Sequence, residues 1–316
     1  MCWNWPSWVN FSEFRWLHLA KKFLSPASFL SLFSAGWEIV GLPVTVPVCR
    51  AAPLSPPARP ASCWPTVLFS PGMGCSRTTM SQLCYQLASR GVVVAALEHR
   101  DGSGHGSFTI EDDGRQEEIP HLAVPVDCNE YRVRHGQVQH RAEEIVRAVE
   151  LLARLNRGEQ VENCLLGGAD LTMFHSRLDM EENLFLAGHS FGGGSVLLAQ
   201  PRLPEVRAVL CLDPWMFPLH QHSFTITAPT LVVNTETFLN PRNIEVIEAA
   251  AAKSDTVRFS VLRGGVHLSA TDVPSCFPGT SLKQGLGFMS YMQPEQVMEK
   301  TNQIVWNWVK SYSKQA

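Results

Sequence analysis

Residues 184–200 read LFLAGHSFGGGSVLLAQ, and the architecture of the chain follows from them. Residues 184–187 form a short apolar run typical of a buried strand, and residues 195–200 can continue as a helix after the glycines. Between them lies the pattern G-x-S-x-G at residues 188–192, which places Ser190 on a sharp turn at the end of a strand. We interpret Ser190 as a nucleophile; a Gly-rich turn with a capping serine is the alternative.

Apolar strands and helices alternate on both sides of this stretch. We expect strands at 66–69, 92–97, 208–212, 230–233 and 257–262, and helices at 78–89, 138–155, 243–252 and 294–310. Such alternation predicts an α/β fold, with a mostly parallel sheet covered by helices on both faces. Residues 102–136 and 156–182 are polar and irregular, and we expect them to be surface excursions.

The N-terminal part differs in composition from the rest. Residues 1–65 comprise an apolar segment rich in Trp and Phe, with helical spacing, and a Pro-rich loop at 52–65. We expect residues 66–316 to form the core, and the whole chain to be one domain. The apolar segment either packs on that core or lies at a lipid interface, where Trp beside Lys is favoured.

Composition narrows the range of functions and compartments. The net charge of −3 gives no basic footprint, so we expect no nucleic-acid binding. Nine cysteines, an odd number with no C-x-x-C pair, indicate mostly free thiols in a reducing compartment. No run approaches the ~18 to 20 apolar residues of a membrane span. We expect a cytoplasmic protein, with secretion as the alternative because residues 23–36 resemble part of a signal peptide.

A serine nucleophile needs a base, an acid and N–H donors for the oxyanion. In an α/β-hydrolase the chain order is Ser, acid, His, each at the carboxyl end of a strand. His267 follows the last expected strand and is the candidate base. Asp213 and Glu236 each follow a strand, and their positions alone do not decide which is the acid. We expect the His189 side chain to point away from the site.

The oxyanion donors are predicted from two loops. The Phe191 N–H opens the helix after Ser190, and the Met73 N–H lies in the Gly-rich loop that follows the strand at 66–69. Trp215 is a candidate for an apolar acyl pocket. His220 and His222 lack a nearby third ligand, so we expect no metal and no cofactor.

Six segments resemble a known family. These are FSPGMG at 69–74, LASRGVVVAALEHRDGSG at 87–104, GHSFGG at 188–193, LDPWMFPL at 212–219, VVNTETF at 232–238 and VH at 266–267. They resemble the lipase-like platelet-activating factor acetylhydrolases, which are calcium-independent phospholipases A2 of the plasma and intracellular types.

The resemblance implies an α/β-hydrolase fold and a catalytic triad of Ser190, Asp213 and His267. It assigns the oxyanion hole to Met73 and Phe191, and it places Trp215 in the acyl pocket. It also implies hydrolysis of the sn-2 acetyl, short or oxidised acyl ester of phospholipids at a membrane or lipoprotein surface. A carboxylesterase or lipase without phospholipid preference, or a weakly catalytic lipid-binding protein of the same fold, is the alternative. Pro71 stands where the family usually has His.

Overall fold

The computed structural model describes residues 52, 54–55, 63–111, 113–122, 124, 129–161, 170–251, 257–277 and 279–314. The apolar segment and most of the Pro-rich loop predicted within residues 1–65 lie outside these ranges. Within them, the Trp64 indole N–H donates to the Ser55 carbonyl at 3.1 Å.

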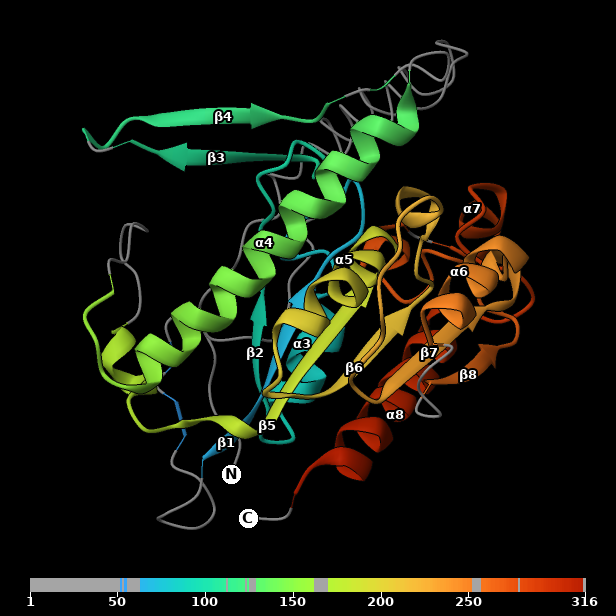
Figure 1. The fold of residues 1–316 in the computed structure, drawn as a ribbon. Helices are drawn as coiled ribbons and strands as arrows, with labels where there is room; N and C mark the ends of the chain where they lie inside the picture. Colours follow the sequence, from blue (N-terminus) through green and yellow to red (C-terminus); the bar gives the residue numbers. More distant parts are fainter. Residues whose placement is uncertain are drawn as a thin grey trace.

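A six-stranded sheet forms the centre of the molecule, in the order β2-β1-β5-β6-β7-β8 (Figure 1). Every neighbouring pair in it is parallel. The strands are β1 (Trp64–Ser70), β2 (Val93–Ala96), β5 (Leu178–His189), β6 (Val206–Leu212), β7 (Thr230–Thr235) and β8 (Val257–Leu262). This confirms the predicted α/β fold with a mostly parallel sheet.

Helices cover both faces of the sheet (Figure 1). One face carries α4 (Glu130–Asn156), α5 (Phe191–Ala199) and α6 (Pro241–Ala251), whose apolar side chains join those of the sheet in one buried cluster. The opposite face carries α3 (Ser81–Ala88) and α8 (Pro294–Tyr312), which form a second cluster with the other side of the same strands. Burial on both faces explains why the strands read as continuous apolar runs.

The carboxyl ends of the strands lie on one rim of the sheet. His189, at the end of β5, is level with Leu212, at the end of β6. On the other side, Thr235 ends β7 level with Leu262 of β8. Parallel pairing therefore brings the loops that follow β5, β6, β7 and β8 to the same edge, where ligands bind in open α/β sheets.

Both predicted excursions contain regular structure, and residues 156–182 include a 3-10 helix at Leu171–Phe174 and the start of β5 at Leu178. Residues 102–136 include a separate antiparallel hairpin, β3 (Gly106–Ile110) and β4 (Gln116–Pro120). Helix α4 begins at Glu130, eight residues before the predicted start, with the Asn129 side chain accepting the Arg132 N–H as its cap. The early turns were missed because their buried face carries polar side chains instead of apolar ones.

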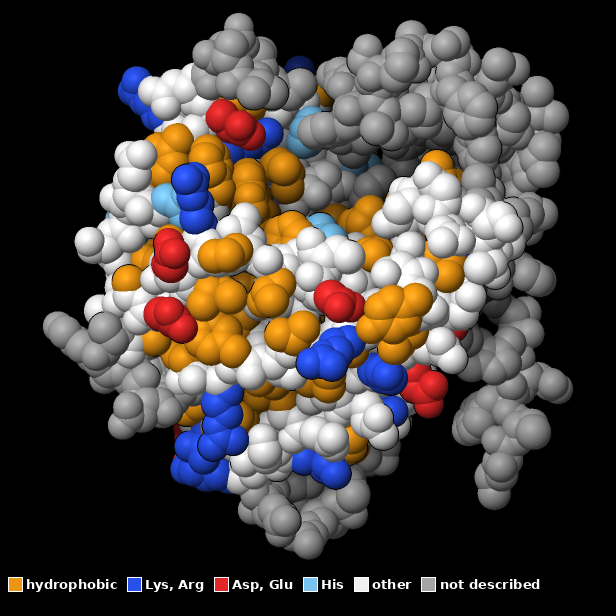
Figure 2. All heavy atoms as spheres, turned by 90° about the vertical axis from the view of Figure 1, so that its right-hand side faces the viewer, with side chains coloured by type: hydrophobic (Ala, Val, Ile, Leu, Met, Phe, Trp, Pro, Cys, Tyr) orange, Lys and Arg blue, Asp and Glu red, His pale blue; other side chains and the backbone are white. Residues whose placement is uncertain are grey.

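The sheet ends at β8, and this edge faces the viewer in Figure 2. Apolar side chains are visible on this face between charged ones, and Phe259 and Val261 of β8 are among the exposed large hydrophobic residues. A short helix, α7 (Thr280–Gly285), lies between β8 and α8 in the chain. In the described part of the chain, no helix combines the length and apolarity that crossing a membrane requires.

Candidate active site

The turn at Ser190 has the strained geometry of a nucleophile elbow. Ser190 has φ 55° and ψ −119°, a conformation that residues other than glycine rarely adopt. A Cβ on Gly188 would lie 2.3 Å from the Gly192 carbonyl oxygen, and one on Gly192 would lie 2.0 Å from the Ser70 carbonyl oxygen. Only glycine allows strand β5, helix α5 and the end of β1 to meet this closely.

Three side chains far apart in the sequence form one hydrogen-bonded chain. The Ser190 Oγ lies 2.9 Å from the His267 Nε2, and the His267 Nδ1 lies 3.2 Å from the Asp213 Oδ2. Asp213 is buried at 2% exposure, whereas His267 is half-buried. An imidazole between a hydroxyl and a buried carboxylate can accept the hydroxyl proton and stabilise the resulting positive charge.

Of the two candidate acids, Asp213 is the one that contacts His267. Its Oδ1 accepts the Thr235 N–H at 2.6 Å, and its Oδ2 accepts the Thr235 hydroxyl, also at 2.6 Å. These bonds orient the carboxylate toward the ring. Glu236 is exposed, and its carboxylate accepts the Gly264 N–H at 2.9 Å and the Tyr291 hydroxyl at 3.3 Å. It therefore braces the loop that leads to His267.

Two rings stack on His267. Phe238, which ends a short 3-10 helix at Glu236–Phe238, stacks on it at 3.8 Å between ring centroids and an interplanar angle of 15°. The His189 ring lies 4.7 Å from it, and its Nε2 lies 3.1 Å from the His267 carbonyl oxygen. Our expectation that His189 points away from the site is therefore wrong. Burial, together with the nearby His267, lowers the pKa of His189 to about 3, so it supports the site as a neutral ring.

The two segments that carry the predicted oxyanion donors border Ser190. Phe191 is the first residue of α5, where backbone N–H groups have no partner within the helix. A Cβ on Gly72 would lie 3.1 Å from the Ser190 Cβ, so the loop that contains Met73 borders the nucleophile. Within the described part of the chain, the Met73 N–H has no hydrogen-bond partner. These two groups can meet a negative oxygen that forms next to Ser190.

Trp215 lies on the same side of the elbow. Its backbone N–H donates to the Ser190 carbonyl at 2.9 Å, and its ring contacts the Phe191 ring at 5.6 Å between centroids. The Phe217 ring stacks on the Trp215 ring, with 5.5 Å between their centroids. Phe191 is fully buried, whereas Trp215 and Phe217 are partly exposed, so these two stacked rings are the ones that could border an acyl group.

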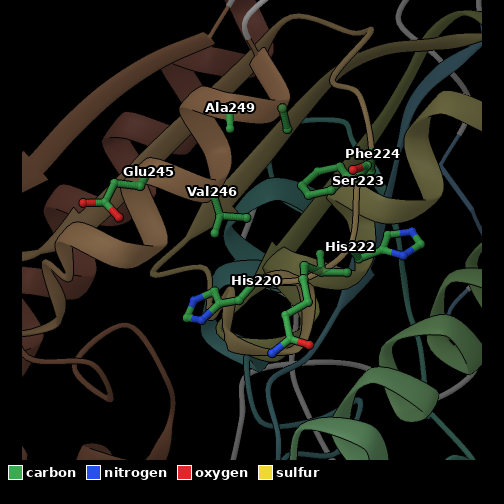
Figure 3. A pocket seen from close by; sticks show the side chains of 10 residues that line it. His220, His222, Ser223, Phe224, Glu245, Val246 and Ala249 are labelled. Atoms are coloured by element: carbon green, nitrogen blue, oxygen red, sulfur yellow. The ribbon is translucent and has the colours of Figure 1, made fainter.

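The histidines considered for metal binding lie apart from this site. His220 and His222 line a cavity of about 480 Å³ with Glu245, but the His222 ring points away from the other two side chains (Figure 3). Among the described residues, the atoms close enough to share an ion belong to His189, Asp213 and His267. Because the latter two bond to each other and to Ser190 and Thr235, their arrangement favours proton transfer over metal ligation.

Sequence reasoning missed the residues that support these groups. Phe238 ends the family-like segment VVNTETF at 232–238, but its contact with His267 depends on the path of the loop after β7. Helix α4 carries a row of buried polar residues, Arg134, Gln137 and Arg141, of which Arg141 contacts the loop that contains Met73. Their spacing of three and four residues is helical, and this pattern was the available signal.

Comparison with known proteins gives an independent result. Residues 10–314 match the family model described as platelet-activating factor acetylhydrolase, isoform II. A platelet-activating factor acetylhydrolase from Canis lupus familiaris is 32% identical over 223 residues, which are 68% of this chain and 50% of that protein. The protein of the same name from Gallus gallus is 30% identical over 228 residues, 68% of this chain and 54% of that protein.

More distant matches agree with the fold. A putative phospholipase A2 from Schizosaccharomyces pombe is 27% identical over 69% of this chain and 61% of that protein. The solved structure of a ferulic acid esterase from Streptomyces cinnamoneus superposes on this chain with a TM-score of 0.54 and 22% sequence identity. The alignment covers 98% of this chain and 80% of the esterase chain. The chain spans about half to three fifths of the length of these curated relatives. With nearly its whole length matched by the family model, the chain belongs to the platelet-activating factor acetylhydrolase, isoform II, family.

Proposed function

We propose that this chain is a serine esterase that hydrolyses the sn-2 acetyl or short or oxidised acyl ester of platelet-activating factor and related phospholipids. The observation that carries the reaction type is the 2.9 Å contact between the Ser190 Oγ and the His267 Nε2 beside buried Asp213. Family membership supports the phospholipid substrate.

Acylation follows from this geometry. The Ser190 oxygen attacks the sn-2 carbonyl carbon while His267 Nε2 takes the hydroxyl proton, and the carbonyl oxygen becomes an oxyanion. The Met73 and Phe191 N–H groups donate to that oxyanion. When the tetrahedral intermediate collapses, the bond to the glycerol oxygen breaks, and His267 returns the proton to the departing lysophospholipid.

Deacylation repeats the same steps with water. His267 removes a proton from a water molecule whose oxygen attacks the acyl-enzyme carbonyl. The bond to Ser190 then breaks, the carboxylic acid leaves, and the proton returns to the Ser190 oxygen. Asp213 holds the Nδ1–H tautomer throughout and stabilises the imidazolium, and no metal or cofactor takes part. The partly exposed, stacked rings of Trp215 and Phe217 support Trp215 as part of the acyl pocket.

A labelling experiment tests the reaction type. An organophosphonate should form a covalent adduct on Ser190 of the parent protein, because only an activated serine reacts. The Ser190→Ala variant should remain unlabelled and hydrolyse acetyl-phosphatidylcholine at least about 10³-fold more slowly, as removal of a triad nucleophile does. An unlabelled, inactive parent protein would indicate the lipid-binding alternative.

Substrate choice is tested separately. Values of kcat/KM should be compared for an sn-2 acetyl phospholipid, its long-chain analogue and a simple aryl acetate. The proposal requires the acetyl phospholipid to have a higher kcat/KM than the long-chain phospholipid and a higher kcat/KM than the aryl ester. Equal use of aryl and phospholipid esters would indicate a general carboxylesterase.

We also propose a cytoplasmic location with peripheral contact to phospholipid surfaces. Cys63, Cys75, Cys84, Cys211 and Cys276 carry free thiols in the described ranges, which suits a reducing compartment. The Trp-rich N-terminal sequence supports surface contact. Co-sedimentation with phosphatidylcholine vesicles, compared between the parent and Trp8→Ala, measures this contact.

A further inference from the structure

A fully buried arginine lies beneath the loop that contains Met73. Arg141 comes from the middle of α4 and is 0% exposed. Its Nη1 donates to the Pro71 carbonyl at 2.6 Å, and its Nη2 lies 3.4 Å from the Gly72 carbonyl. The first bond is short and charge-assisted, and the second is long and weak. The guanidinium therefore holds the backbone of this loop through two consecutive carbonyls.

The two carbonyls matter because of covalent connectivity. The Gly72 carbonyl and the Met73 N–H belong to one planar peptide group, so fixing the oxygen fixes the direction of the hydrogen. The same guanidinium carbon lies 4.6 Å from the centre of the Phe191 ring. Arg141 thus contacts both segments that carry the predicted oxyanion donors, one through the backbone and one through the ring.

Arg141 is itself held in place. Its Nε–H donates to the Asp101 Oδ2 at 3.0 Å and to the Ser103 Oγ at 2.9 Å. Gln137, one turn earlier on α4, donates to the Asp101 carbonyl at 3.0 Å. Burial alone would raise the pKa of Asp101, but Arg141 and the bonds from Ser103 hold it below its ordinary value. Asp101 is therefore ionised and forms a buried ion pair with Arg141.

A second buried connection holds the beginning of the loop. The Ser70 Oγ lies 2.8 Å from the His99 Nε2, and the His99 Nδ1 lies 2.6 Å from the Glu144 Oε2 on α4. These residue types match a triad, but Ser70 is 0% exposed and cannot meet a substrate. Burial, with Arg141 nearby, lowers the pKa of His99 to about 4, so the ring is neutral and acts as a fixed hydrogen-bonding bridge.

We propose that Arg141 is a positioning residue that aims the Met73 N–H and the Phe191 segment at the oxyanion, with the Ser70–His99–Glu144 chain as a second tie on the same loop. The role rests on the serine-esterase function proposed above. Donors to an oxyanion are effective only when they are already in place as charge develops, and small displacements are costly. A Gly-rich loop has no such rigidity by itself, and the contacts from Arg141 on α4 supply it.

The test replaces Arg141 while keeping its charge. Arg141→Lys can still pair with Asp101 but cannot reach both that carboxylate and the two carbonyls. The control is Arg77→Met, which removes an exposed arginine from the same loop region; Arg77 pairs with the partly buried Glu98. Active sites are counted by organophosphonate titration, so that misfolded molecules do not enter the rates.

The prediction concerns the rate for each titrated site. For Arg141→Lys we expect kcat to fall about 10- to 100-fold with KM within about twofold, since only the transition state carries the oxyanion. The inhibition constant of a trifluoromethyl ketone, whose adduct with Ser190 carries the same oxyanion, should rise by a similar factor. Arg77→Met should match the parent in all three quantities.

Unchanged kcat for each site, or unchanged ketone affinity, would overturn the proposal. If Arg141→Lys yields no titratable protein, Ser70→Ala decides, because it removes one buried hydroxyl: a lower kcat at constant KM supports the positioning role, and an unchanged kcat refutes it. A parent protein that neither labels nor turns over would instead refute the proposed esterase function, which separates the two failures.

Discussion

Asp213 and Glu236 show how little separates an acid that can assist catalysis from one that braces a loop. Both follow parallel strands at the same rim, but the Thr235 N–H and hydroxyl direct the Asp213 carboxylate at His267. Glu236 turns instead to Gly264 and Tyr291. The hydrogen-bond partners of each carboxylate therefore decide which of the two can fix the tautomer of His267.

Matched amide substitutions test this assignment. Asp213→Asn should lower kcat by about 10³-fold or more, because an amide favours the wrong tautomer of His267. Glu236→Gln keeps an oxygen that can accept the Gly264 N–H, and should retain kcat within about threefold. Steady-state kinetics on an acetyl phospholipid measure both. A dead Glu236→Gln beside an active Asp213→Asn would reverse the two roles.

At the scale of elements, the site depends on how closely β1, β5 and α5 approach one another. Gly192 faces the Ser70 carbonyl at a distance that excludes any Cβ. Gly136, in the second turn of α4, is exposed, and a Cβ there would have nothing within 4 Å. The two glycines therefore lie in opposite environments. Gly192 is required because no side chain fits beside the Ser70 carbonyl, whereas Gly136 has no such contact and only lowers the stability of the helix.

This contrast predicts opposite effects of one substitution. Gly192→Ala should destabilise the fold by about 3 kcal/mol or more, since a backbone carbonyl must move. Gly136→Ala should stabilise it by up to about 1 kcal/mol, because alanine is the better helix former. Urea unfolding of the two variants and the parent measures the difference. Equal midpoints for Gly192→Ala and the parent would contradict the packing described at the elbow.

At the scale of the whole molecule, two buried neutral histidines link stability to pH. The pKa of His99 is lowered to about 4 and that of His189 to about 3. In the unfolded chain both take up protons near pH 6.5. Between these values the unfolded state binds more protons, so stability is complete above pH 6.5 and is lost as pH falls. Asp272 opposes this trend, since burial raises its pKa to about 6 and the folded state takes up its proton first.

A single substitution isolates one histidine from this balance. His189→Phe keeps a ring of similar size but cannot titrate, so the stability of the variant should depend less on pH. Between pH 6.5 and 4 its slope should be about 1.4 kcal/mol per pH unit smaller than that of the parent. Urea unfolding at pH 7, 5.5 and 4.5 gives both slopes. The exposed His175→Gln should leave the slope unchanged, and an equal slope in His189→Phe would show that His189 is charged in the folded protein.

The predicted features share a local cause. Ser190, Asp213 and His267 could be found because each follows an apolar strand, and parallel strands bring their carboxyl ends to one rim. The choice between Asp213 and Glu236 could not be made by position, because it depends on hydrogen bonds made by Thr235. The Arg141 network was not predicted, because polar side chains along one helix face normally indicate exposure to solvent. Here the loop that contains Met73 packs against Arg141 instead.

Ser190 and Asp213 both have positive φ, at 55° and 46°, without being glycine. Glycine would occupy such conformations at a lower energy, by about 1 to 3 kcal/mol at each position. At Ser190, glycine would therefore relieve backbone strain at the cost of the proposed nucleophile. At Asp213, the same change would leave the buried Thr235 N–H and hydroxyl without their acceptor, so the gain from relieved strain would be offset by two unpaired donors.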